Sequence, residues 1–65
     1  MVILNKKLKA KRELSNLTQE DISNKAAIST RTYQNYELGL RSPKVEIAIK
    51  IAEILDSTVE ELFQS

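Results

Sequence analysis

Residues 17–39 read LTQEDISNKAAISTRTYQNYELG and hold the start and stop signals of two short helices. Thr18 is a favourable N-cap, and Asp21 three residues later can complete a capping box by reaching back to the cap amide. Ser29 is a second N-cap, and Gly39 ends the following helix because glycine adopts the left-handed conformation at little cost. The two expected helices, joined by a tight turn, span residues 19–26 and 30–38.

The flanking sequence predicts three more helices. Asn5 can cap a first helix that runs to about Leu14. Ser42-Pro43 supplies a cap followed by proline at the first helical position, and Ser57 with Glu60 is a second capping box near the C-terminal end. The later helices are expected to run from Pro43 to Leu55 and through Val59, Leu62 and Phe63. Apart from a possible extended stretch at Met1–Leu4, no strand pattern competes, so we expect an all-α, compact five-helix bundle in a single domain, residues 1–65.

Length and composition exclude most enzyme classes. A chain of 65 residues buries only about 60% of the surface that it exposes when unfolded, which leaves little room for a large active-site cavity. There is no Cys and no His, so thiolate and imidazole chemistry, disulfides and most zinc sites are absent. An enzyme would have to use carboxylates, lysines or hydroxyls, and no carboxylate pair lies where burial would perturb it. We expect no catalytic residue, metal, cofactor or small-molecule ligand.

The charges are unevenly distributed along the chain. Residues 1–44 hold nine basic and four acidic side chains, whereas residues 45–65 hold one basic and five acidic ones. Such a split predicts one pole that attracts a polyanion and one that is repelled by it, although scattered helical surface charge is an equally open explanation. The longest apolar run, Met1–Leu4, is too short for a membrane span or a signal peptide, so we expect a cytoplasmic protein that does not contact membranes.

The helix expected after Pro43 has two apolar stripes. One is made of Val45, Ala48, Ile49, Ala52 and Leu55, and the other, on nearly the opposite side, of Ile47, Ile51 and Ile54. A helix that is apolar on two sides is usually buried on both, either within its own bundle or against another chain. We expect a homodimer whose interface includes Ile47, Ile54 and Phe63; the alternative is a monomer in which the last helix and Met1–Leu4 cover these isoleucines.

Two short helices joined by a tight turn form a helix-turn-helix unit. The residues within this unit indicate a particular family more specifically than its geometry does. The runs LTQEDIS (17–23), ISTRTY (28–33), YELG (36–39) and RSP (41–43) resemble the Xre-like, phage-repressor (Cro-type) helix-turn-helix family. The resemblance continues at residues 51–55 and 59–63, and so covers about Leu8 to Phe63. It implies a lambda-repressor-like DNA-binding domain whose third helix enters the major groove of double-stranded DNA.

The resemblance also implies roles for individual residues. Arg12 and Glu37 match a pair that ties the first helix to the end of the third through a partly buried ion pair. Gln19 matches a glutamine that contacts a phosphate and braces the recognition helix, and Arg41 lies in a loop that follows the DNA backbone.

The chemistry of the third helix gives further candidates. Arg31 can in principle form two hydrogen bonds with a guanine edge, although a phosphate contact or a solvated charge is the alternative. Tyr33 and Tyr36 are expected to face the core. The base-reading candidates are Thr30, Arg31, Gln34 and Asn35. The phosphate candidates are Thr18, Gln19, Ser29, Thr32, Arg41 and Lys44.

Three positions depart from the family's frequent glycines: Asn16, Ala27 and Asp56. Asn and Asp tolerate a left-handed conformation, whereas Ala27 would carry about 1 kcal/mol of strain if the turn needs positive φ. Ala26 is small where the family has a large aliphatic residue, and Tyr33 is large, so the tyrosine ring can fill the space that Ala26 leaves.

We therefore expect a sequence-specific, double-stranded DNA-binding transcriptional regulator, a repressor, that binds a palindromic operator as a homodimer. Two other functions remain open at this point. One is an antitoxin-like protein-interaction module with secondary DNA binding, which a co-purifying partner would favour; the other is an enzyme that uses carboxylates or lysines.

Overall fold

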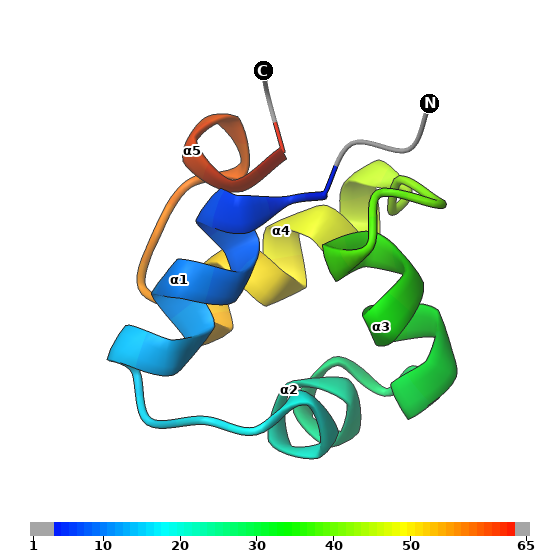
Figure 1. The fold of residues 1–65 in the computed structure, drawn as a ribbon, viewed down its shortest axis with the longest axis horizontal. Coiled ribbons are helices and arrows are strands. Elements are labelled where there is room, and N and C mark those ends of the chain that lie inside the picture. Colours follow the sequence, from blue (N-terminus) through cyan, green and yellow to red (C-terminus); the bar gives the residue numbers. More distant parts are fainter. Residues whose placement is uncertain (1–3, 64–65) are drawn as a thin grey trace.

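The computed structural model describes residues 4–63, which form five helices and no strand (Figure 1). The helices are α1 (Lys6–Leu14), α2 (Gln19–Ala26), α3 (Thr30–Glu37), α4 (Val45–Ile54) and α5 (Val59–Phe63). The prediction of an all-α five-helix bundle is confirmed. An extended stretch was suggested at Met1–Leu4, of which residues 1–3 lie outside the described residues.

The first three helices begin at the predicted caps. The Asn5 side chain accepts a hydrogen bond from the Leu8 amide at 3.0 Å. Thr18 and Asp21 form both bonds of the capping box, at 3.0 and 2.9 Å, and the amide and hydroxyl of Thr18 hold the pKa of the Asp21 carboxyl below its usual value. The Ser29 hydroxyl accepts from the amide three residues later at 3.1 Å. These side chains satisfy amides that a helix N-terminus otherwise leaves unpaired.

The starts of the last two helices differ from the prediction. The N-cap of α4 is Lys44, which is extended (ψ 158°) and makes no side-chain cap bond, so Pro43 precedes the cap instead of opening the helix. The chain thus stays extended past the proline before it turns into α4. At α5 the Thr58 hydroxyl accepts from the Glu61 amide at 3.1 Å, whereas the Ser57 hydroxyl donates to the Glu61 carboxylate at 3.0 Å. The predicted box of Ser57 with Glu60 is therefore wrong by one residue.

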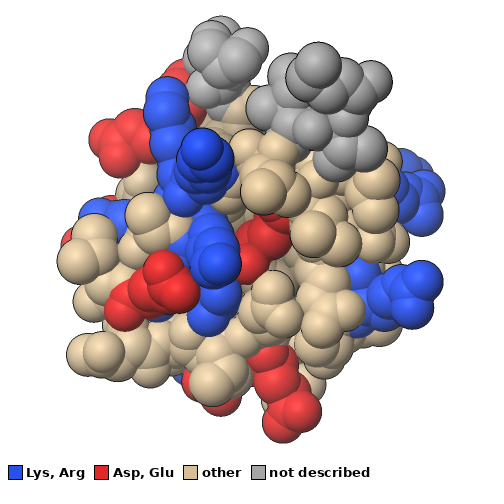
Figure 2. Space-filling model, in the orientation of Figure 1, with Lys and Arg blue, Asp and Glu red and all other residues tan. Residues whose placement is uncertain are grey.

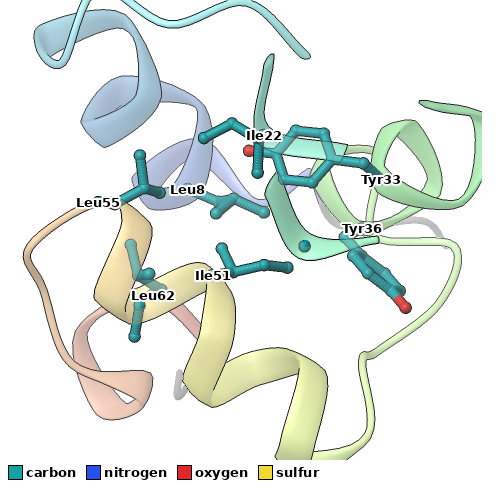
Figure 3. Close-up of a cluster of buried hydrophobic side chains, with 9 residues drawn as sticks. Leu8, Ile22, Tyr33, Tyr36, Ile51, Leu55 and Leu62 are labelled. Carbon is teal, nitrogen blue, oxygen red and sulfur yellow. The ribbon is translucent and has the colours of Figure 1, made fainter. Parts of the chain in front are cut away.

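Side chains from all five helices meet in one core (Figure 3). Its members include Leu8, Ile22, Tyr33, Ile51 and Leu62, each at most 3% exposed. Ala26 and Tyr33 are both fully buried in this cluster, as expected if the tyrosine ring fills the space that the small alanine leaves. The Tyr33 ring also lies edge-on to the ring of Tyr36, with centroids 6.5 Å apart. Both tyrosines therefore face the core, as predicted.

The two stripes of α4 are not arranged as predicted. Ala48, Ile51, Ala52 and Leu55 are buried, and Ile47 and Ile54 are half-buried against the core. The apolar side chains of α4 that remain exposed are Val45 (72%) and Ile49 (46%). In the second predicted stripe Ile51 is buried and Ile47 and Ile54 are partly covered, because α4 packs against both α2 and α5 within the same chain.

A buried ion pair connects α1 to the end of α3. Arg12 Nε donates to Glu37 Oε2 at 2.6 Å and Arg12 Nη2 donates to Glu37 Oε1 at 3.3 Å, with side chains only 13% and 5% exposed. Burial raises the pKa of the Glu37 carboxyl, but the hydrogen bonds from Arg12 and its other neighbours outweigh this, so the pKa lies below its ordinary value. The Glu37 carbonyl also accepts from the Asn5 amide at 2.8 Å.

The turn between α2 and α3 places a non-glycine residue in the left-handed region. Ala27 has φ 58° and ψ 41°. Asn16 and Asp56, the other positions where the family often has glycine, have φ 58° and 52°. An alanine in this region costs about 1–2 kcal/mol, because its Cβ approaches the following carbonyl oxygen.

We predict that Ala27→Gly stabilises the domain by about 1 kcal/mol, because relief of the Cβ strain exceeds the added flexibility of the unfolded chain. In a domain of this size that corresponds to a rise in Tm of about 4–8 °C in a thermal melt. Ala10→Gly is the matched control: Ala10 is exposed in the middle of α1, where glycine should lower stability by about 0.5–1 kcal/mol. Equal melting of Ala27→Gly and the parent would show that the turn is unstrained.

We also predict that Glu37→Ala lowers the free energy of unfolding by about 3–5 kcal/mol, because it leaves the largely buried Arg12 guanidinium with the Leu17 carbonyl but without its carboxylate partner. Denaturant titration of the variant measures this loss, and Glu53→Ala, an exposed glutamate of α4, should change stability by no more than about 0.5 kcal/mol. Replacement of both partners, as Arg12→Met with Glu37→Met, should recover most of the loss.

Acid provides an independent check of the same pair. Since the folded-state pKa of Glu37 lies below its ordinary 4.5, the pair contributes its full stability above that pH and loses it as the pH falls through the lower folded value. The unfolding free energy of Glu37→Gln should therefore fall less steeply below about pH 4 than that of the parent. Parallel pH profiles would contradict the assignment.

Candidate nucleic-acid interface

Helices α2 and α3 form a rigid helix-turn-helix unit. The Ile28 amide donates to the Ser23 carbonyl at 3.0 Å, which closes the turn on the end of α2. The Ser23 side chain is fully buried, and its hydroxyl lies 3.1 Å from that of Thr30, the first residue of α3. The turn is thus fixed to α2 by a backbone hydrogen bond, and the start of α3 by a side-chain hydrogen bond.

The other end of α3 is braced by a chain of side-chain hydrogen bonds. Gln19 Nε2 donates to Glu37 Oε1 at 3.0 Å, and Gln34 Nε2 donates to Gln19 Oε1 at 3.2 Å. Together with Arg12, these residues link α1, α2 and α3. The structure therefore shows contacts that fit the bracing role expected for Gln19. It also adds Gln34 to the brace, which the sequence did not indicate, because the bond joins residues 15 positions apart.

The four base-reading candidates lie in different environments. Arg31 is exposed and Asn35 is half-buried, and their spacing places them on the side of α3 opposite the buried Tyr33 and Tyr36. Gln34 is half-buried and uses its amide nitrogen in the brace. The Thr30 hydroxyl is used in the contact with Ser23. Arg31 and Asn35 therefore have the freest polar groups of the four.

The phosphate candidates gather around the ends of α2 and α3. Thr18 caps α2 and Gln19 begins it, while the hydroxyls of Ser29 and Thr32 lie 2.8 Å apart at the start of α3. Arg41 and Lys44 are exposed in the segment between α3 and α4. This segment folds back on α3, because the amides of Leu40 and Arg41 both donate to the Asn35 carbonyl, at 2.9 and 3.4 Å. Arg41 is thereby held beside the last turn of α3.

Basic side chains occupy two parts of the surface in the view of Figure 2. One group projects from the edge formed by α3 and the segment that follows it, and the other lies over α1, with acidic side chains beside it. Among residues 4–63 no group of three acidic side chains could hold a metal ion. No described helix has the length and apolarity needed to cross a membrane.

Comparison with known proteins supports the helix-turn-helix assignment. A family model described as helix-turn-helix matches residues 8–62. An uncharacterized HTH-type transcriptional regulator of Methanocaldococcus jannaschii, MJ0272, is 40% identical over 57 residues, which are 88% of this chain and 86% of that protein. Two further similar proteins are longer: the chain spans 49% of a second curated relative and 58% of one solved regulator.

Two solved structures have closely similar folds. The restriction-modification controller protein C.AhdI from Aeromonas hydrophila superposes with a TM-score of 0.82 at 25% identity, over 91% of this chain and 89% of that one. The regulator SinR, solved in complex with DNA, has a TM-score of 0.81 at 20% identity, over 92% of this chain and 97% of that one. The family model over residues 8–62 and the relative that is 40% identical show that the chain belongs to the Xre/Cro-type helix-turn-helix family of transcriptional regulators.

Proposed function

We propose that the chain binds double-stranded DNA in a sequence-specific manner, with α3 in the major groove, and that it represses transcription by occupying its operator. The observation that carries this proposal is that α3 has an outward polar face, with Arg31 exposed, and is held at both ends by partly buried hydrogen bonds. A rigid helix with free donors and acceptors is what direct readout of base edges requires.

Each candidate on α3 has a matching base chemistry. The Arg31 guanidinium can donate two hydrogen bonds to O6 and N7 of a guanine, and the Asn35 amide can pair with N6 and N7 of an adenine. Gln34 reads through the part of its amide that the brace leaves free, and Thr30 makes at most a minor contact. Arg31 is therefore the residue on which specificity is expected to depend most.

Phosphate contacts on either side of α3 would fix its position along the groove. We assign these contacts to Gln19 at the start of α2 and to Arg41 after α3. Three hydroxyl side chains and one lysine are assigned the same role: Thr18, Ser29, Thr32 and Lys44. Charged and polar groups at these positions set the register of a recognition helix without reading sequence themselves. The structure of SinR was solved with DNA, which supports the same class of ligand for this chain.

Two copies are expected to bind a palindromic operator. In helix-turn-helix dimers the half-sites lie about 34 Å apart, so that the two recognition helices enter successive major grooves on one side of the duplex. The acidic residues after position 44 would then lie away from the phosphates. The interface predicted from sequence at Ile47, Ile54 and Phe63 stays a prediction, although these side chains are already half-buried within one chain.

We predict that binding to DNA selected from a random library weakens steeply with salt. If each copy neutralises about four phosphates, log K falls against log salt with a slope of about −3 to −4 per copy. Arg41→Gln should reduce this slope by about 1, whereas Lys50→Gln, on the exposed strip of α4, should leave it unchanged. Fluorescence anisotropy across a salt series measures both slopes, and affinity that is independent of salt would refute the proposal.

We further predict that Arg31→Ala and Arg41→Ala have different signatures. Arg31→Ala should cost about 1–3 kcal/mol on the selected operator and relax the preference at one base pair, whereas Arg41→Ala should weaken binding to operator and random DNA alike. Gln19→Ala should behave like Arg41→Ala, with an added loss of folding stability because it also removes the brace. An equal loss on both kinds of DNA for Arg31→Ala would remove it from the base-reading residues.

A further inference from the structure

An open cavity lies between the start of α1, helix α5 and the segment that joins α3 to α4, in the upper part of the view in Figure 1. Its volume is about 580 Å³, within the range of roughly 300–1,000 Å³ that is usual for small-molecule sites. None of the four base-reading candidates is among the described residues that line it. Its walls come from segments far apart in the chain, so no local pattern indicated a ligand site and we expected none.

Asn5 joins the three walls of this cavity. Its backbone amide donates to the Glu37 carbonyl at the end of α3, at 2.8 Å, and its Nδ2 donates to the Leu62 carbonyl of α5, at 2.7 Å. Its Oδ1 accepts from the Leu8 amide of α1 at 3.0 Å. Because these bonds hold the walls together within the chain, the cavity is already formed before a ligand arrives, as most ligand sites are.

The polar side chains left free around the cavity can all donate hydrogen bonds. Lys6, Lys7 and Arg41 are exposed, and none of them forms an ion pair with another residue of the described range 4–63. Tyr36 directs its hydroxyl away from the core side chains (Figure 3), and Ser42 is exposed. No acidic side chain is found in the described lining. Such a set of groups suits a ligand whose polar end accepts hydrogen bonds and carries more than one negative charge.

Apolar side chains make up another part of the lining. Leu4 is 53% exposed, Phe63 is half-buried, and Leu62 reaches the cavity from the core. A ligand that covers Leu4 and Phe63 removes apolar surface from water, which is favourable. An inorganic anion would meet the basic side chains and leave this surface in water. The lining as a whole therefore fits an organic anion with an apolar body.

We propose that this cavity binds a small organic phosphate, with its phosphate group among Lys6, Lys7 and Arg41 and its apolar body against Leu4 and Phe63. A phosphate monoester carries close to two negative charges at neutral pH and has three strong acceptor oxygens, which a single carboxylate does not match. Arg41 is also a proposed DNA phosphate contact, so the bound ligand competes with DNA for its guanidinium. This consequence, regulation of operator binding by the ligand, rests on the proposed function.

Calorimetric titration of the full chain without DNA tests the site. The probe is 1-naphthyl phosphate, which joins an aromatic body to a phosphate group, and its two halves, inorganic phosphate and 1-naphthol, are titrated separately at equal ionic strength. We expect the whole probe to bind one-to-one and about tenfold more tightly than either half. Binding no tighter than that of inorganic phosphate would overturn the proposal, because it would show attraction to surface charge alone.

Variants with matched charge locate the site. Lys6→Gln with Lys7→Gln should weaken binding of the probe about tenfold, whereas Lys25→Gln with Lys50→Gln, at exposed positions on α2 and α4, should bind like the parent. The first change removes cations that oppose the macrodipole of α1, so its melting temperature should be unchanged or higher. Leu4→Ser should weaken binding about threefold. Equal weakening by the two double variants would show that net charge, and not the cavity, attracts the probe.

The competition with DNA has its own readout. On the selected operator, saturating 1-naphthyl phosphate should lower the affinity of the parent by the same factor as Arg41→Gln does, relative to inorganic phosphate at equal ionic strength. At the same probe concentration the variant with Lys6→Gln and Lys7→Gln should keep its operator affinity. An unchanged affinity of the parent at saturation would remove Arg41 from the ligand site.

The two proposals can fail separately, because the calorimetric readout contains no DNA. A chain that binds the probe as expected but binds no selected DNA refutes the proposed function alone. A chain that binds its operator but not the probe refutes the cavity assignment alone.

Discussion

A buried charge is tolerable in so small a domain only when it is fully paired, and in this chain the paired charge is Glu37. Its carboxylate accepts from Arg12 and Gln19, and its backbone carbonyl accepts from the Asn5 amide, so one residue at the end of α3 holds α1 and the start of α2. An eight-residue helix such as α3 is too short to be stable alone. Its position relative to the rest of the domain therefore depends on this carboxylate and on the Ser23–Thr30 contact at its other end.

The same arrangement separates the two sides of α3. Tyr33 and Tyr36 are buried toward the core, and burial together with the nearby Glu37 charge raises the pKa of Tyr33, which keeps its phenol neutral. Arg31 and Asn35 are left on the outer side. The inner side of α3 thus supplies the stability that lets the outer side be polar, and a change in either tyrosine would be expected to alter how the helix sits in the bundle.

Most features that depend on near neighbours in the sequence were predictable, although the cap of α5 was placed one residue too early. The Arg12–Glu37 pair joins residues far apart in the sequence and was expected from the family resemblance and not from a local signal. The caps Asn5, Thr18 and Ser29, and the strained turn at Ala27, follow from hydrogen bonds and dihedral angles within a few residues. The start of α4 was placed too early because the path of the chain after α3 decides where Pro43 lies. The periodicity of the sequence identified two apolar stripes on α4 but could not tell which of them α2 and α5 would cover. The hydrogen bond from Gln34 to Gln19 had no signal in the nearby sequence.

The bond between Gln34 and Gln19 restricts the bases that Gln34 could meet. One N–H of its Nε2 is committed to Gln19, so without breaking this bond Gln34 can offer a groove its carbonyl oxygen Oε1 as an acceptor and only the second N–H as a donor. An acceptor pairs with the exocyclic amino group of adenine or cytosine and is repelled by the oxygens of guanine and thymine. If α3 reads bases as proposed, a contact that needs both N–H groups of Gln34 would have to break its bond to Gln19 and so loosen the fold, whereas a contact to its carbonyl oxygen would leave the fold intact.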